Sequence, residues 1–348
     1  MMKAILFPAA LATGMAMAGA AWAEPPAPYS VTPELEAAAR SEGRVVFYTA
    51  TDVTVAEKLA QLFREKYPEI QVQVERAGSE RVFQRIGQEY SSGIYNADVI
   101  ETSDAVHFNY FKRQGWLTPT LPQVVADQWP ADERDPDGQF AAYRAHLSVL
   151  AYRTDLLPEQ EAPKTWTDLL DPRFKGKAVK AHPGYSGTVM TATHVLSDLL
   201  GWEYFEKLGK QSVMQVQSST EPPKKLAQGE RAVQVDGNEY NVFRLQDEGL
   251  PIKIVYPEEG TPLAVGNAAV LKNARNPNAA KLFYAFLFSR EAQQLNSDFG
   301  GLRSFHPEVK EKEGRTPLSA IKLLHSDPEA LEKKIREIKT NYERYFGT

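Results

Sequence analysis

Short apolar runs alternate with amphipathic segments through the first third of the chain, and this alternation constrains the fold more than any other feature. The run GRVVFYTATD, residues 43–52, predicts a buried strand, and residues 54–69 repeat apolar side chains at helical spacing. A second strand and helix are predicted at 70–78 and 79–93, and a third strand at 96–105. Strands that alternate with helices form βαβ units, so the sequence predicts an α/β fold with a mainly parallel sheet.

The predicted strands end in small polar residues. Ligands of such sheets bind in the crevice beyond the carboxyl ends of the strands. Thr49 and Thr51 follow the first strand, and Ser103 follows the third. These three hydroxyls are therefore candidate ligand donors, and simple turn or cap roles are the alternative.

Composition narrows the class of protein. The 348 residues allow about two domains, each with its own core. The formal net charge is −5, which predicts no nucleic-acid partner. The chain has no cysteine, which excludes thiolate catalysis, cysteine metal sites and a lipid-modified N-terminal cysteine.

The first 23 residues have the pattern of a secretory signal peptide. Lys3 precedes an apolar run that ends in Ala-Trp-Ala at 21–23, so cleavage is expected before Glu24. A retained membrane anchor is the alternative, and it needs about 20 apolar residues without a cleavage site. The mature protein is therefore expected in an extracytoplasmic compartment, most simply the bacterial periplasm.

Several segments resemble a known family. PKTWTDLLDPRFKGKAV at 163–179 and GNAAVLKNARNPNAAKLFYAFLFSREAQ at 266–293 resemble segments of the extracellular solute-binding proteins, family 1, of bacterial ABC importers. The strand ends GRVVFYTATD and ADVIETSDA also match that family. The nearest branch contains the periplasmic ferric-ion-binding proteins and relatives that handle phosphonates, sugar phosphates and other small anions.

The resemblance implies a type II periplasmic binding protein, in which two α/β lobes close on a ligand about two crossover strands. It implies a monomer without a cofactor, whose partners are a small-molecule ligand and an ABC permease in the inner membrane. The crossings are expected near 143–150 and 254–262. The predicted division is 1–23 signal peptide, 24–145 plus 258–305 lobe one, 146–257 lobe two, and 306–348 C-terminal helices packing on the lobes.

The ferric branch commonly binds iron through two adjacent tyrosines. The segment EYNVFRL keeps Tyr240 but has Asn241 in place of the second tyrosine, and an amide oxygen is a neutral, weaker donor. No histidine follows the first strand, and Ser103 stands where some relatives have a glutamate. No metal site is therefore predicted, and iron bound by Tyr240 with a synergistic anion is the alternative.

An anion suits the remaining candidates better. Ser186, Gly187 and Thr188 begin a predicted amphipathic helix, whose free N–H groups and positive dipole end bind carboxylate or phosphate. Ser186 could equally be a helix cap. Tyr240 could donate its hydroxyl or stack on an organic ligand, and Asp236 could receive an amine or cap its loop. Candidate positive partners are Arg81, Arg85, Lys180 and Arg244.

No enzyme is predicted. The chain has no G-x-S-x-G elbow, H-E-x-x-H motif, P-loop or Rossmann glycine fingerprint. The sequence predicts the substrate-binding component of an ABC transporter, which captures a small organic or phosphorylated anion by hinge closure. A binding lobe that signals through a membrane receptor is a further alternative.

Overall fold

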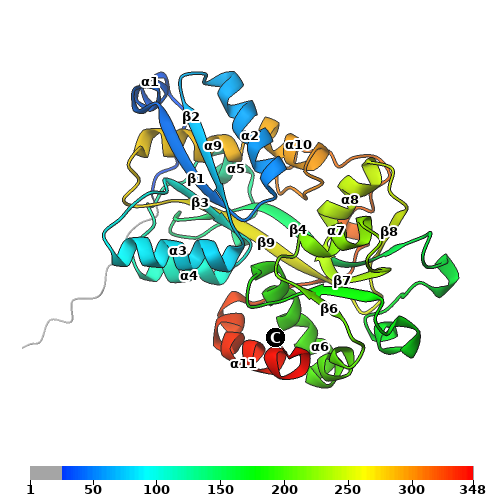
Figure 1. Cartoon of the computed structure of the whole chain (residues 1–348). Helices are drawn as coiled ribbons and strands as arrows, with labels where there is room; N and C mark the ends of the chain where they lie inside the picture. The colour runs from blue at the N-terminus through cyan, green and yellow to red at the C-terminus, as the bar shows by residue number, and fades with distance from the viewer. Residues whose placement is uncertain (1–25, 348) are drawn as a thin grey trace, which may run out of the picture.

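The strands form one mixed sheet in the order β2-β1-β3-β9-β4-β7-β5-β6, with β8 paired to β4 and β10 paired to β9 (Figure 1). The computed structural model describes residues 26–347, so the predicted signal peptide at 1–23 lies outside the described residues. The strands are β1 (Arg44–Thr49), β2 (Gln71–Arg76), β3 (Val99–Thr102), β4 (Ala141–Arg153), β5 (Ala178–Ala181), β6 (Met214–Val216), β7 (Val233–Asn238), β8 (Ile252–Val255), β9 (Thr261–Val270) and β10 (Leu323–Leu324).

Helices cover both faces of the sheet, as the alternating pattern predicts. They are α1 (Pro33–Glu42), α2 (Val53–Lys66), α3 (Ser79–Ser91), α4 (Ala105–Arg113), α5 (Gln123–Gln128), α6 (Gly187–Gly209), α7 (Glu221–Ala227), α8 (Glu239–Asp247), α9 (Pro277–Leu287), α10 (Arg290–Asp298) and α11 (Pro328–Phe346).

Strand β1 shows how the sheet is covered at its first end. Val45 and Phe47 pack on the core beneath α1, α2 and α9, whereas Val46 and Tyr48 pack against α3 and α4. Successive side chains of a strand point to opposite faces, so an apolar run without polar interruption is what two covered faces require. β1 pairs in parallel with β2 and β3, which confirms the predicted βαβ units.

Strand β4 joins the two ends of the sheet. Its first half, Ala141–Leu147, pairs with β9, and its second half, Ser148–Arg153, pairs with β7 and β8. Separate apolar cores lie on either side of this change of partner. The predicted α/β class is confirmed, whereas the predicted lobe boundaries stay a prediction.

One helix differs from the sequence prediction. Helix α6 was predicted to be amphipathic, but every residue from Gly187 to Ser197 is buried, so this prediction is wrong for its first turns. One reason is α11, which packs against α6 and also against α4 (Figure 1). Leu331 and Ile338 of α11 form one apolar cluster with Val106 and Met190. Within residues 26–347, no helix is long and apolar enough to cross a membrane.

Candidate functional site

A small cavity lies where strand ends from both halves of the sheet meet. Its volume is about 10 Å³, about the room that one water needs. Arg76, Arg144, Asn238 and Tyr240 line it. Hydroxyl side chains supply much of the remaining lining, namely Ser79, Ser103, Ser186, Thr188, Ser218 and Ser219. Among the described residues that line the cavity, none carries a carboxylate.

A larger cavity of about 410 Å³ lies elsewhere, between α4, β9 and the segment before α11. Its lining mixes apolar side chains with acidic ones, including Glu133 and Asp135. A ligand site needs a few polar groups that converge on the ligand, and the hydroxyl and guanidinium donors converge on the smaller cavity. We therefore take the smaller cavity as the candidate site.

Three helices begin at the small cavity. The N-cap residues are Gly78 for α3, Ser186 for α6 and Asn238 for α8, and all three line the cavity. Gly78 and Asn238 make no side-chain capping bond, so the first N–H groups of α3 and α8 have no capping acceptor and can donate to a ligand. The positive ends of three helix dipoles therefore converge on the cavity.

Arg144 is held in place by a buried glutamate. Glu101 Oε1 accepts hydrogen bonds from Arg144 Nε at 3.2 Å and Nη2 at 2.9 Å. Glu101 Oε2 accepts from the hydroxyls of Thr49 and Thr51, at 2.5 and 3.0 Å. Burial opposes the charge on Arg144, but Glu101 outweighs it, so the pKa of the guanidinium is raised. Arg144 is therefore charged, and its charge is balanced by Glu101.

Arg76 is the cation of the cavity that has no acidic partner. It is the last residue of β2, is half-buried, and donates to Ser218 Oγ across the cavity at 3.3 Å. No carboxylate within the described chain lies within ion-pair distance of its guanidinium. Its positive charge is therefore available to a ligand.

A chain of hydrogen bonds runs from Arg144 toward the cavity. A guanidinium can only donate, so Arg144 Nη1 donates to His146 Nδ1 at 3.0 Å. His146 is buried, and burial and then Arg144 keep its pKa well below its usual value, so it is neutral. Its Nε2–H therefore donates to Thr188 Oγ1 at 2.8 Å. The tautomer is fixed by these two partners.

The chain of donors continues onto two serines. Thr188 Oγ1 donates to Ser103 Oγ at 3.1 Å, and Ser103 Oγ lies 2.8 Å from Ser79 Oγ. Either serine of this pair can be the donor, and Ser79 Oγ also accepts from the Ser103 N–H at 3.2 Å. In the arrangement with Ser103 as the donor, Ser79 accepts both bonds. The Ser79 hydroxyl proton is then left for a ligand in the cavity.

Tyr240 adds a second free donor. Burial raises the pKa of its hydroxyl to about 12, although Arg144 works against this. The side chain is therefore a neutral phenol at pH 7. Its ring packs edge-on against His146 at 6.0 Å, and no residue in the described range 26–347 hydrogen-bonds its hydroxyl.

The structure brings part of the predicted site together. Ser103, Ser186, Thr188 and Tyr240 line the cavity. Gly187 lies beside it, where a Cβ would come within 2.7 Å of Asp104 Cβ, so glycine permits the close approach of α6 to the turn after β3. Their roles as ligand donors stay a prediction.

Other predicted residues are engaged elsewhere. Thr49 and Thr51 bond to Glu101, as described above. Asp236 is fully buried and forms an ion pair with Lys180, and Asn241 accepts from Asn238 Nδ2 at 3.3 Å. The remaining predicted cations also have protein partners, since Arg81 donates to Gln217, Arg85 pairs with Glu75 and Glu89, and Arg244 pairs with Asp52.

Sequence reasoning missed Arg76, Arg144, Ser79 and His146. Arg76 had a signal, because it stands at a predicted strand end as Thr49 and Ser103 do. Arg144 and His146 had a weaker signal, as two polar residues at alternate positions of the apolar run AAYRAHLSVLAYR. Ser79 had none beyond its place at a helix start.

The chain matches a known protein family over most of its length. The profile of the bacterial extracellular solute-binding proteins matches residues 49–294, well over half of the chain. The protein therefore belongs to this family, as the sequence resemblance predicted. Its similarity to the two-lobed periplasmic binding proteins below confirms the predicted fold.

Three relatives illustrate the range of the family. The periplasmic binding protein AfuA from Actinobacillus pleuropneumoniae, solved with exogenous fructose-6-phosphate bound, is 25% identical, with a TM-score of 0.79 over 88% of this chain and 99% of that one. The probable ABC transporter periplasmic-binding protein y4fP of Sinorhizobium fredii is 21% identical over 74% of both chains. Iron uptake protein A2 of Synechocystis is 25% identical over 64% of this chain and 68% of its own.

Proposed function

We propose that the protein is the periplasmic substrate-binding component of an ABC importer, and that its ligand is a small organic anion with a phosphate or carboxylate group. The observation that carries this proposal is the small cavity. It combines the unpaired Arg76 guanidinium, three helix N-termini and free hydroxyl donors, with no carboxylate among its described lining residues.

A buried anion needs this combination. Removing a phosphate or carboxylate from water is costly unless charge and hydrogen bonds replace the lost hydration. Charge-assisted hydrogen bonds from Arg76, together with the Ser79 and Tyr240 hydroxyls, supply that replacement. The similarity to AfuA, which was solved with a sugar phosphate, supports a phosphorylated ligand.

Closure of two lobes would complete the site. We take lobe one as 24–145 with 258–305 and lobe two as 146–257, so that Arg76 belongs to the first and Ser218 to the second. Direct contacts such as Arg76–Ser218 leave room for about one water, so the ligand enters when the lobes separate. β4 changes its pairing partner between Leu147 and Ser148, which suits a hinge.

Ferric iron is the second candidate, because Tyr240 is present and one relative is named an iron uptake protein. A trivalent ion needs anionic oxygen ligands, and the described lining offers two guanidiniums and no carboxylate. Tyr240 would also have to lose a proton from a hydroxyl whose pKa is about 12. These features favour the organic anion.

Thermal unfolding against a panel of ligands tests the proposal. The panel contains fructose 6-phosphate, methylphosphonate, citrate, an aromatic carboxylate and Fe³⁺ with citrate, each with and without a strong chelator. A ligand at 100 times its Kd should stabilise the protein by about 2.7 kcal/mol. We expect an anion to do so in the presence of the chelator. Stabilisation by iron alone, with a visible tyrosinate-to-iron absorption band, would overturn the proposal.

A further inference from the structure

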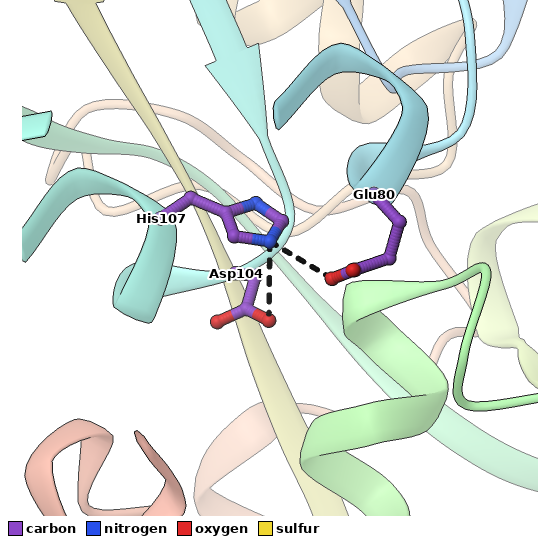
Figure 2. Close-up of side chains that lie close together, drawn as sticks. All are labelled: Glu80, Asp104 and His107. Atoms are coloured by element: carbon purple, nitrogen blue, oxygen red, sulfur yellow. Dashed lines mark hydrogen bonds and ion pairs between the residues drawn. The ribbon is translucent and has the colours of Figure 1, made fainter. Parts of the chain in front are cut away.

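Three ionisable side chains meet on the far side of the turns that carry Ser79 and Ser103. Glu80 lies in the first turn of α3, Asp104 caps α4, and His107 lies in the first turn of α4 (Figure 2). All three are buried, and one ligand atom from each lies within 4.8 Å of the others. His107 Nε2 is 2.9 Å from Glu80 Oε1 and 3.8 Å from Asp104 Oδ2.

One carboxylate oxygen of Asp104 accepts no hydrogen bond. Its Oδ1 accepts from the Val106 N–H at 2.9 Å, which is the helix cap. Its Oδ2 is buried and has no hydrogen-bond partner in the described structure, although the side chain is only 1% exposed. Figure 2 shows this carboxylate directed at the imidazole. A buried carboxylate oxygen without a donor is costly, so it indicates a further binding partner.

The imidazole is oriented to present Nε2 to the two carboxylates. His107 Nδ1 lies 3.1 Å from Thr102 Oγ1, which can accept its proton. Without an ion, Nε2 donates its own proton to Glu80 Oε1 at 2.9 Å, and an ion bound between the two carboxylates would take the place of that proton. A metal-bound histidine is commonly held in this way, by a hydrogen bond from its other nitrogen.

The spacing of the three donors also suits an ion. Zinc bonds of about 2.0–2.2 Å in a tetrahedral site place neighbouring donors about 3.3 Å apart. The separations of 2.9 and 3.8 Å at His107 Nε2 lie on either side of that value. One histidine and two carboxylates leave a fourth position for water. We propose that Glu80, Asp104 and His107 bind a divalent metal ion of the zinc type.

A route to this site exists. Asp104 also lines the cavity of about 410 Å³, so the cluster lies beside an open space through which an ion could approach. Lys339 of α11 is a competing cation, with Nζ 3.5 Å from Glu80 Oε2. Lys339 contacts Glu80 Oε2, whereas Oε1 is the oxygen that faces His107. The Lys339 side chain is 37% exposed, so water can solvate it if a bound ion displaces it from Glu80.

The proposed ion site is separate from the anion cavity. Glu80 and Asp104 follow directly after Ser79 and Ser103, but neither the glutamate nor His107 lines the small cavity. Ion binding would therefore stabilise the two turns on which the serines sit without contacting the ligand.

Calorimetric titration of the EDTA-treated full-length protein with Zn²⁺ tests this proposal. We expect one saturable site, with affinity reduced at least tenfold in Asp104→Asn and in His107→Gln. Asp104→Asn keeps the capping oxygen, so it is expected to fold. Asp327→Asn is the matched control, because Asp327 also caps a helix but is exposed and outside the cluster, and it should bind as the parent does.

A second readout protects the test against unfolded variants. Co²⁺ added to the parent protein should give the visible absorption bands of a four-coordinate site, and Zn²⁺ should abolish them. Zn²⁺ should also raise the Tm of the parent and leave that of Asp104→Asn unchanged. The proposal is overturned if Zn²⁺ does not bind the parent below about 1 mM, or if folded Asp104→Asn and His107→Gln bind it as tightly as the parent does.

Discussion

The turns at residues 79–80 and 103–104 each carry a serine that faces one site and an acidic residue that faces another. Ser79 and Ser103 face a cavity of donors, whereas Glu80 and Asp104 face a cluster of acceptors around His107 (Figure 2). Successive residues of a helix are rotated by about 100° around its axis, which separates Ser79 from Glu80. Asp104 has an extended backbone, in which successive side chains point to opposite sides, and this separates Ser103 from Asp104. A single turn can therefore separate a site for anions from a site for cations.

Helix capping explains why the side with Ser79 and Ser103 suits an anion and the side with Glu80 and Asp104 suits a cation. On the acceptor side, Asp104 caps α4 and so satisfies the positive end of that helix with protein atoms. On the donor side, Gly78 precedes α3 and Asn238 precedes α8 without a capping bond. The N–H groups there are left for a ligand.

The largest expected effect is on the free energy of unfolding, and it comes from removing the charge of Glu101, which pairs with Arg144 at the cavity. Glu101→Gln leaves Arg144 charged and buried without its carboxylate, and breaking such a pair costs about 3–5 kcal/mol. Urea unfolding at pH 7 measures this loss. Glu75→Gln is the control, because its pair with Arg85 is partly exposed and should contribute less than about 1 kcal/mol. Similar losses in both variants would contradict the supporting role of Glu101.

The next effect concerns affinity for the anion. Arg76→Ala removes a hydrogen bond to a charged group, worth about 1.5–3 kcal/mol, which is about 10–100-fold in Kd. Arg81→Ala is the matched control, because Arg81 is exposed and donates to Gln217 outside the cavity. Calorimetric titration with fructose 6-phosphate distinguishes them. Equal losses would mean that the positive charges act by general attraction and that Arg76 is not a contact.

A smaller effect on the anion Kd tests whether the adjacent residues Ser79 and Glu80 serve different sites. Ser79→Ala removes one hydrogen bond from a neutral donor to the anion and should weaken binding about 10-fold, at the lower end of the range for bonds to a charged group. Glu80→Gln changes the adjacent residue on the acceptor side and should leave the anion Kd within about twofold of the parent, by the same scale. If Glu80→Gln weakens anion binding more than Ser79→Ala does, the separation is wrong.

A last effect is the dependence of the free energy of unfolding on pH. His146 stays neutral when folded, because burial and Arg144 lower its pKa, whereas the unfolded chain binds a proton below about pH 6.5. The unfolded state therefore gains protons first, and the free energy of unfolding falls between pH 7 and 5, by up to about 1.4 kcal/mol per unit. His146→Asn should reduce that slope. An unchanged slope in urea unfolding would show that His146 does not remain neutral.

Much of the fold was predictable because it depends on local periodicity. The runs at 43–52 and 70–78 alternate with helical segments, and the structure places strands and helices there. The buried first turns of α6 were not predictable, because α11 covers them from more than 130 residues away in sequence. Tertiary packing of this kind overrides an amphipathic pattern read from one segment.

The candidate site was only partly predictable, because the sequence does not show in which direction a side chain at a strand end points. A strand-end rule selects Thr49, Thr51 and Ser103 equally, but only Ser103 lines the cavity, while both threonines turn to Glu101. The same rule would have selected Arg76. The hydrogen bonds from His146 to Thr188 and from Thr188 to Ser103 join residues 42 and 85 positions apart, which no local pattern encodes.

A crystal structure of the protein with the anion that stabilises it most tests the central claim directly. The account predicts the phosphate or carboxylate group in the small cavity, with its oxygens within hydrogen-bonding distance of Arg76 and of the Ser79 hydroxyl. It would be contradicted by an anion bound in the larger cavity beside α4 and β9, or by a metal ion coordinated through Tyr240.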